Sequence, residues 1–261
     1  MERKDRGMSG RRPIMAGNWK MHKTASEAGG LVQELARGLE GQRPACEVVV
    51  APPFTSIPAA IEQTRGTIIQ VAAQDLHWED KGAFTGEISG PMLREAGCSF
   101  VIIGHSERRQ IFGETDATVN LKVASAIRND LIPIFCLGET IEERQAGVTF
   151  EVVRAHLRGG LGDIRPLDAQ RFVIAYEPVW AIGTGHTATP AQAQEVHAFL
   201  RREFATLLGN DFSAQVRVIY GGSVKPDNTR SLMACEDIDG GLVGGASLNS
   251  ADFLGIIKEG T

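Results

Sequence analysis

Closely spaced cysteines, long apolar runs and an excess of basic residues are all missing from this sequence. The four cysteines lie far apart, with no C-x-x-C pair, which predicts buried, reduced thiols and a cytoplasmic location. No apolar stretch approaches the ~20 residues that span a bilayer. The net charge is −5, with acids and bases mixed along the chain, so we expect neither a nucleic-acid partner nor a membrane partner.

The first segment also lacks the features of a targeting signal. Residues 1–12 are charged and contain no apolar core, which excludes a secretory signal, and Glu2 and Asp5 argue against a transit peptide. We therefore predict a disordered charged tail over residues 1–12 and one domain over residues 13–261. Apolar residues make up 43% of the chain, enough for one full core.

Short apolar runs rich in β-branched residues recur every ~32 residues, the length of one βα unit. They begin near Ile14, Glu47, Ile69, Phe100, Ile132, Phe172, Arg217 and Gly240. The runs are mostly continuous, which is typical of parallel strands covered on both faces. Helical patterns lie between them, and the clearest starts at Pro190, where Thr189 and Gln192 can form a capping box. This alternation is typical of a doubly wound sheet or a closed barrel, and eight units without a linker favour a single-domain (β/α)₈ barrel of the α/β class.

Active sites of such barrels lie just after the strands, and charged side chains occupy these positions here. They are Lys20, His105, Glu107 and Glu177. Each alone has an ordinary explanation: a solvated lysine, a structural histidine or a surface charge cluster. Glu177 is the hardest to explain in this way, because a carboxylate directly after a buried strand is costly unless it is partnered or used. Together the four residues predict a catalytic site.

Glycine-rich turns follow the seventh and eighth predicted strands. Gly222 and Ser223 lie in the first turn, and Gly244 and Gly245 lie in the second. Glycines let a backbone approach a ligand closely and direct N–H groups at it, and these two loops often bind phosphate in this fold. The alternative is a pair of tight turns without a ligand.

The string GTGHTA at residues 183–188 matches a dinucleotide-binding pattern, G-x-G-x-x-A. That pattern requires its glycines between a strand and the helix that they open. Here Pro178 and Trp180 separate the strand from the first glycine, and Pro190 starts the helix too late. We interpret Pro178–Ala188 as a long loop of the kind that closes over active sites.

Five strings together resemble those of triosephosphate isomerases. They are GNWK at 17–20, GHSERR at 104–109, AYEPVWAIGTG at 175–185, YGGSV at 220–224 and LVGGAS at 242–247. The match extends from about residue 13 to the C-terminus, in register with all eight units. The resemblance implies interconversion of D-glyceraldehyde 3-phosphate and dihydroxyacetone phosphate through an enediolate, in glycolysis and gluconeogenesis, without a cofactor or a metal.

The resemblance also implies a role for each site residue. Glu177 would be the base, and His105 would polarise the carbonyl and move protons between the two oxygens. Lys20 would supply positive charge to the substrate and the enediolate, and Asn18 would help to hold the geometry. Ser106 and Glu107 would support these groups. Backbone N–H groups would bind the phosphate, and they belong to Gly183, Ser223, Gly244 and Gly245.

A second long loop, Gln74–Glu87, carries Trp78 and Phe84. By sequence alone it could be an ordered surface loop on its own barrel. The resemblance implies that it inserts into a partner subunit of a homodimer, with Thr85 near the partner's active site. Two residues depart from the family pattern: His22, where asparagine is common, and His186, where lysine is frequent.

Two other functions remain as alternatives. Another phosphate-binding barrel, such as a phosphosugar aldolase or a phosphoribosyl isomerase, would share the fold. An aldolase needs a Schiff-base lysine, typically on the sixth strand, and residues 172–176 contain none. A non-catalytic scaffold would not need Lys20, His105 and Glu177 together.

Overall fold

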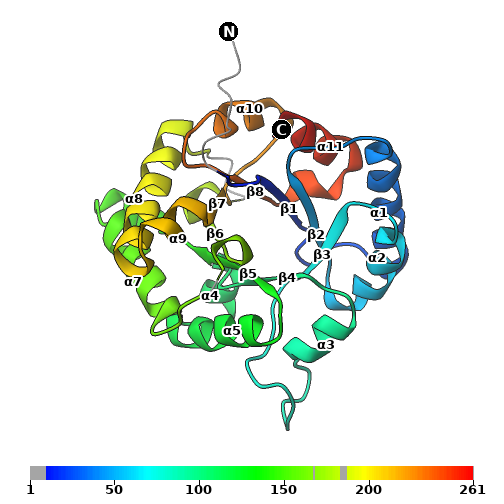
Figure 1. Ribbon diagram of the computed structural model, residues 1–261, viewed down its shortest axis with the longest axis horizontal. Helices are drawn as coiled ribbons and strands as arrows, with labels where there is room; N and C mark the ends of the chain where they lie inside the picture. Colours follow the sequence, from blue (N-terminus) through cyan, green and yellow to red (C-terminus); the bar gives the residue numbers. More distant parts are fainter. Residues whose placement is uncertain (1–9, 167, 183–186, 261) are drawn as a thin grey trace.

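Eight strands form the centre of the structure, a computed structural model that describes residues 10–166, 168–182 and 187–260. The strands are β1 (Ile14–Asn18), β2 (Glu47–Ala51), β3 (Ile69–Ala73), β4 (Phe100–Ile103), β5 (Ile132–Leu137), β6 (Val173–Tyr176), β7 (Arg217–Tyr220) and β8 (Gly240–Val243). They pair in parallel in chain order, and β8 pairs with β1, so the sheet closes into a barrel (Figure 1). The expected single-domain (β/α)₈ barrel is confirmed.

Helices surround the barrel as an outer ring (Figure 1). They are α1 (Ala25–Leu39), α2 (Ile57–Thr64), α3 (Gly90–Glu95), α4 (Ser106–Phe112), α5 (Asp116–Arg128), α6 (Ile141–Gln145), α7 (Thr149–Leu161), α8 (Pro190–Leu208), α9 (Asn210–Gln215), α10 (Pro226–Met233) and α11 (Ser250–Glu259). The capping box predicted at Thr189 and Gln192 is present at the start of α8. Among the helices of the described residues, none is both long and apolar enough to cross a membrane.

Strand starts follow the sequence pattern closely. All predicted starts agree with the structure except that of β6, which begins at Val173 instead of Phe172. The difference has a local cause: residues 169–171 form a 3₁₀ turn, and Phe172 caps it. Since β6 is only four residues long, its end fixes where Glu177 enters the barrel mouth.

The core has two layers, because successive residues of a strand point to opposite faces. In β6, Val173 and Ala175 belong to the cluster that fills the barrel. Ile174 and Tyr176 belong to the larger cluster between the strands and the helices. This alternation turns the Tyr176 ring outward, where it meets His197 of α8, and leaves the residue after the strand at the mouth of the barrel.

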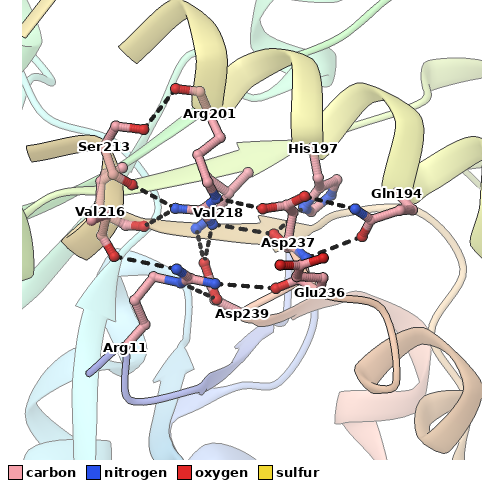
Figure 2. Close-up of polar contacts among 11 residues, drawn as sticks. Arg11, Gln194, His197, Arg201, Ser213, Val216, Val218, Glu236, Asp237 and Asp239 are labelled. Atoms are coloured by element: carbon pink, nitrogen blue, oxygen red, sulfur yellow. Dashed lines mark hydrogen bonds and ion pairs between the residues drawn. The ribbon is translucent and has the colours of Figure 1, made fainter. Parts of the chain in front are cut away.

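The contacts of the barrel begin before the predicted domain boundary at residue 13. Arg11 Nε donates to Asp239 Oδ1 at 2.7 Å, and its terminal nitrogens donate to the carbonyls of Ala214 and Glu236 (Figure 2). Arg12 donates to two backbone carbonyls ahead of β2. Both arginines, assigned to the tail from the sequence, therefore belong to the barrel. Residues 1–9, the rest of the predicted tail, lie outside the described residues.

Candidate active site

Side chains from three strand ends meet at one end of the barrel. His105 follows β4 and Glu177 follows β6, and the His105 Nε2 atom lies 3.0 Å from Glu177 Oε1. Lys20 follows β1, and its Nζ atom lies 2.6 Å from Glu107 Oε1. Glu177 and His105 are buried, with 1% and 6% of their surface exposed. The structure thus brings together the four charged residues that the strand-end rule selects.

The Glu177 carboxylate has a fixed orientation. Its Oε2 atom accepts a hydrogen bond of 2.8 Å from the backbone N–H of Ser106, and its Oε1 atom faces His105. Glycine at position 221 makes room for it, because a Cβ atom there would lie 2.8 Å from Glu177 Cγ. A carboxylate held by a backbone donor in a buried setting is a suitable general base.

The hydrogen bonds of His105 define its tautomer. The backbone N–H of Glu107 donates to Nδ1 at 3.2 Å, so Nδ1 is an acceptor and the proton is on Nε2. His105 also caps the N-terminus of α4, where the helix dipole disfavours an additional positive charge. The Nε2–H of the ring therefore faces Glu177 Oε1 and can donate to an oxygen.

Lys20 has an unusual backbone conformation, with φ of +52°. Its backbone N–H donates to Asn18 Oδ1 at 3.0 Å, and its carbonyl accepts from Gln74 Nε2 at 2.8 Å. Left-handed conformations of residues other than glycine are strained and concentrate at functional sites. Asn18 and Gln74 hold this conformation, and it brings the ammonium group to Glu107. The sequence prediction includes Asn18 but gives Gln74 no role here.

Acidic side chains behind the site are paired with bases. Lys122 Nζ lies 2.7 Å from Asp75 Oδ1 and also pairs with Glu114, and Glu114 Oε2 accepts from the backbone N–H of Gly104 at 3.0 Å. Burial raises the pKa of Asp75, and Lys122 opposes this effect. The cluster fixes the backbone just before His105. In the described residues, no group of three or more His, Cys, Asp or Glu side chains could hold a metal ion.

The turns predicted to bind phosphate follow β7 and β8. Ser223 is half-buried, and the Gly244 carbonyl accepts a 2.7 Å hydrogen bond from the Ser247 hydroxyl. A Cβ atom on Gly244 would lie 3.8 Å from Lys20 Cε, whereas one on Gly245 would meet no atom within 4 Å. The turn after β8 therefore borders Lys20, and the space beside Gly245 is open.

The predicted lid, Pro178–Ala188, is described at its two ends. Gly183, the fourth residue predicted to bind phosphate, lies outside the described residues. At the first end, Trp180 Nε1 donates to Glu139 Oε1 at 3.0 Å, and the Tyr176 hydroxyl donates to the same oxygen at 3.0 Å. Burial and the Glu139 carboxylate raise the pKa of Tyr176 well above its usual value, so the hydroxyl keeps its proton.

Glu139 is a residue that sequence reasoning missed. It is fully buried, and Arg144 Nη1 is a third donor to its Oε1 atom, at 3.2 Å. It lies two residues after β5, so the rule that selected Glu177 could also have found it.

The loop Gln74–Glu87 projects away from the barrel (Figure 1). Thr85 is exposed. At the base of the loop, the His77 ring stacks on Trp78 and packs against Phe84, with ring centroids 4.2 Å apart in both pairs. Phe84 is nevertheless 42% exposed, so the loop presents an aromatic surface outward.

Comparisons with known proteins agree with this architecture. The sequence matches the family described as triosephosphate isomerase over residues 13–260. A triosephosphate isomerase of Moorella thermoacetica is 60% identical over 248 residues, which cover 95% of this chain and 98% of that protein. One of Citrifermentans bemidjiense is 54% identical over 248 residues, with the same shares. The crystal structure of triosephosphate isomerase from Bartonella henselae superposes with a TM-score of 0.87 at 42% identity, covering 95% of this chain and 98% of that one.

Proposed function

The chain belongs to the triosephosphate isomerase family, and on this premise we propose that Glu177, His105 and Lys20 carry out its reaction. The enzyme interconverts D-glyceraldehyde 3-phosphate and dihydroxyacetone phosphate by proton transfer through an enediolate, a step of glycolysis and gluconeogenesis. The meeting of a carboxylate, an imidazole and an ammonium group from three separate strand ends is the observation that supports this assignment most directly.

The geometry suits each step of the proton transfer. Glu177 takes a proton from the carbon beside the carbonyl and returns it to the neighbouring carbon. Negative charge develops on the carbonyl oxygen meanwhile, and it is stabilised by the Nε2–H of His105 and the ammonium group of Lys20. His105 then moves protons between the two oxygens of the enediolate. Asn18, Ser106 and Glu107 hold these three groups through the contacts described above.

The phosphate would be held by backbone N–H groups of Gly183, Ser223, Gly244 and Gly245. The open space beside Gly245 and the Lys20 side chain beside Gly244 support this assignment. An anion bound there would lie next to a fixed positive charge. The loop Pro178–Ala188 would close over it and exclude water, which strengthens the electrostatic contacts inside the site.

The test is a coupled assay with D-glyceraldehyde 3-phosphate. We expect kcat/KM near ~10⁸ M⁻¹s⁻¹ for the wild-type enzyme. Glu177→Gln should lower it by about 10⁴-fold, because an amide cannot act as the base. Glu195→Gln, an exposed change on α8, should leave it unaltered. Comparable rates for the wild type and Glu177→Gln would exclude Glu177 as the base.

We also propose that the enzyme is a homodimer joined through the loop Gln74–Glu87, with Thr85 near the partner's active site. The exposed apolar surface around the barrel mouth supports this arrangement. Met21 is 93% exposed, Ile111 70% and Phe112 67%. Large apolar side chains gathered at one end of a barrel are typical of a protein interface.

For the same enzyme we propose a cytoplasmic location. All four cysteines are free thiols, and three of them are buried. Burial raises the pKa of Cys46 to about 11 and that of Cys98 to about 12, so both stay protonated and unreactive. Thiols of this kind are typical of a reducing compartment.

A further inference from the structure

His197 is a buried titratable side chain that the proposed chemistry does not use. It lies on α8 and is 0% exposed. Its Nδ1 atom lies 3.2 Å from the carbonyl oxygen of Asp237 (Figure 2). A carbonyl can only accept, so Nδ1 carries the proton and Nε2 is left with a lone pair. Nε2 is buried and has no hydrogen-bond partner in the described part of the chain.

Charged groups surround His197 on two sides. Arg201, one helical turn along α8, donates to Asp237 and Asp239, which precede β8 (Figure 2). On the other side, Glu139 lies beyond the Tyr176 hydroxyl. The two aspartates favour a protonated ring and Arg201 opposes it, but burial dominates and lowers the pKa of His197 to about 4. The ring is therefore neutral at pH 7.

His197 also packs against two tyrosine rings. The centroid of Tyr176 is 5.8 Å away in an edge-on arrangement, and that of Tyr220 is 6.5 Å away. The two tyrosines are register partners on β6 and β7. Tyr176 directly precedes the base Glu177, and Tyr220 directly precedes the glycines of the β7 turn. Nε2 makes no hydrogen bond in the described part of the chain. The ring therefore affects the two tyrosines through packing alone.

One of these tyrosines also supports the first end of the proposed lid. The Tyr176 hydroxyl shares Glu139 Oε1 with Trp180, near the start of the lid. Burial raises the pKa of Tyr220 to about 12, and its hydroxyl has no hydrogen-bond partner in the described part of the chain. The imidazole ring therefore packs against the tyrosine that joins the proposed base to the first lid end and against the tyrosine that precedes the β7 turn.

We infer that His197 is a positioning residue: its ring sets the spacing between Tyr176 and Tyr220, and thereby the spacing between Glu177 and the glycine turn after β7 that is proposed to bind phosphate. This inference rests on the proposed function. The ring, and not its hydrogen bond to Asp237, has the larger effect on substrate binding.

Two substitutions separate the ring from the hydrogen bond. His197→Asn keeps a donor near the Nδ1 position but removes the ring, whereas His197→Phe keeps a ring and removes the donor. We expect His197→Asn to raise both KM for D-glyceraldehyde 3-phosphate and the inhibition constant of 2-phosphoglycolate by about tenfold. His197→Phe should stay within about twofold of the wild type in both quantities.

A control variant separates positioning from stability. Phe204→Leu changes another buried residue of α8, one that packs on Phe212 instead of the two tyrosines. It should lower the melting temperature and leave KM and inhibition unchanged. Wild-type KM and inhibition in His197→Asn would overturn the inference, as would equal losses in His197→Asn and His197→Phe. A wild-type enzyme without isomerase activity would count against the proposed function instead.

A further test uses the wild-type enzyme, so it does not depend on whether a variant folds. The ¹⁵N signals of the His197 imidazole should shift when 2-phosphoglycolate saturates the site, because the ligand would lie against Glu177 and the β7 turn, and the ring packs on the tyrosine that precedes each of them. Unchanged His197 signals at saturation would also overturn the inference.

Discussion

Two successive backbone N–H groups orient the proposed catalytic pair, Glu177 and His105. The N–H of Ser106 donates to Glu177, and the N–H of Glu107 donates to Nδ1 of His105. Both belong to the first turn of α4, where N–H groups have no partner within the helix. The same turn therefore holds the carboxylate and the imidazole in the orientation that proton abstraction beside a carbonyl requires.

Gly245 offers a direct test of the proposed phosphate site. Gly245→Leu should raise KM and the inhibition constant of 2-phosphoglycolate by about 10- to 100-fold, because a side chain would block the backbone approach of the phosphate. Folding should be unaffected, since a Cβ atom there meets no neighbour within 4 Å. Gly30→Leu, at an exposed position of α1 that is equally open, is the control and should change neither quantity. Unchanged inhibition in Gly245→Leu would remove this glycine from the phosphate site.

At the residue scale, the sequence predicts strand-end residues well and supporting residues poorly. Glu177 stands out because a carboxylate directly after a buried apolar run demands an explanation. Gln74 and His197 give no such signal, since a glutamine in a loop and a histidine in a helix are both ordinary. Their roles depend on contacts with Lys20 and with two tyrosines on different strands, and those contacts exist only in the folded chain.

The first end of the proposed lid is held by one buried carboxylate. Glu139 Oε1 accepts from Tyr176, Trp180 and Arg144. Glu139→Gln removes the charge that attracts these donors, so the lid end should be held less firmly. We expect kcat/KM to fall by about 10- to 100-fold, measured in the coupled assay.

The control for this change is Glu142→Gln, at an exposed position of the neighbouring helix α6. It alters the net charge equally and should leave kcat/KM as in the wild type. If Glu139→Gln kept wild-type kinetics, the hydrogen bonds to Glu139 would not govern the lid.

Element boundaries follow from local chemistry, which explains why they are predictable here. The start of α8 is set by Thr189, Pro190 and Gln192 within one turn of chain. Closure of the barrel has no local signal of this kind. Arg11 pairs with Asp239 across a sequence separation of 228 residues, and no periodic pattern marks either as a partner of the other.

At the scale of the whole molecule, burial of a neutral His197 makes stability depend on pH. Its pKa is lowered from 6.5 to about 4 in the folded chain, so the unfolded chain binds the proton more tightly. The contribution is complete above pH 6.5 and is lost as the pH falls from 6.5 towards 4. At pH 5 the loss should be about 2 kcal/mol.

Urea unfolding at pH 7.5 and pH 5 checks this prediction, with His197→Phe as the comparison. The loss of unfolding free energy between the two pH values should be smaller in the variant by about 2 kcal/mol. Asp75, whose pKa is raised, acts in the opposite direction, and His156, whose pKa is lowered, acts in the same one. Both residues are present in each protein, so their contributions to the pH dependence of the unfolding free energy cancel in the comparison. Identical pH dependence in the two proteins would contradict the prediction.

Assembly is the other property of the whole molecule. Sedimentation should give twice the mass of the 28.1 kDa chain. Ile111→Glu should shift the protein towards the monomer and lower its activity. Ile111 is 70% exposed in the single chain, so a carboxylate there costs little folding free energy. Burying the same carboxylate in an apolar interface would cost much more free energy of association. Raising the protein concentration should restore activity, since association follows mass action.

The control for assembly lies at the opposite end of the barrel. Ile68 is 45% exposed and precedes β3, so it is far from the loops that follow the strands. Ile68→Glu introduces the same charge and should remain dimeric and active. The two variants together test a directional claim, that the ends of the strands which carry the catalytic groups also carry the interface. A monomeric wild-type protein with full activity would contradict it, because Thr85 of the partner would then have no part in the site.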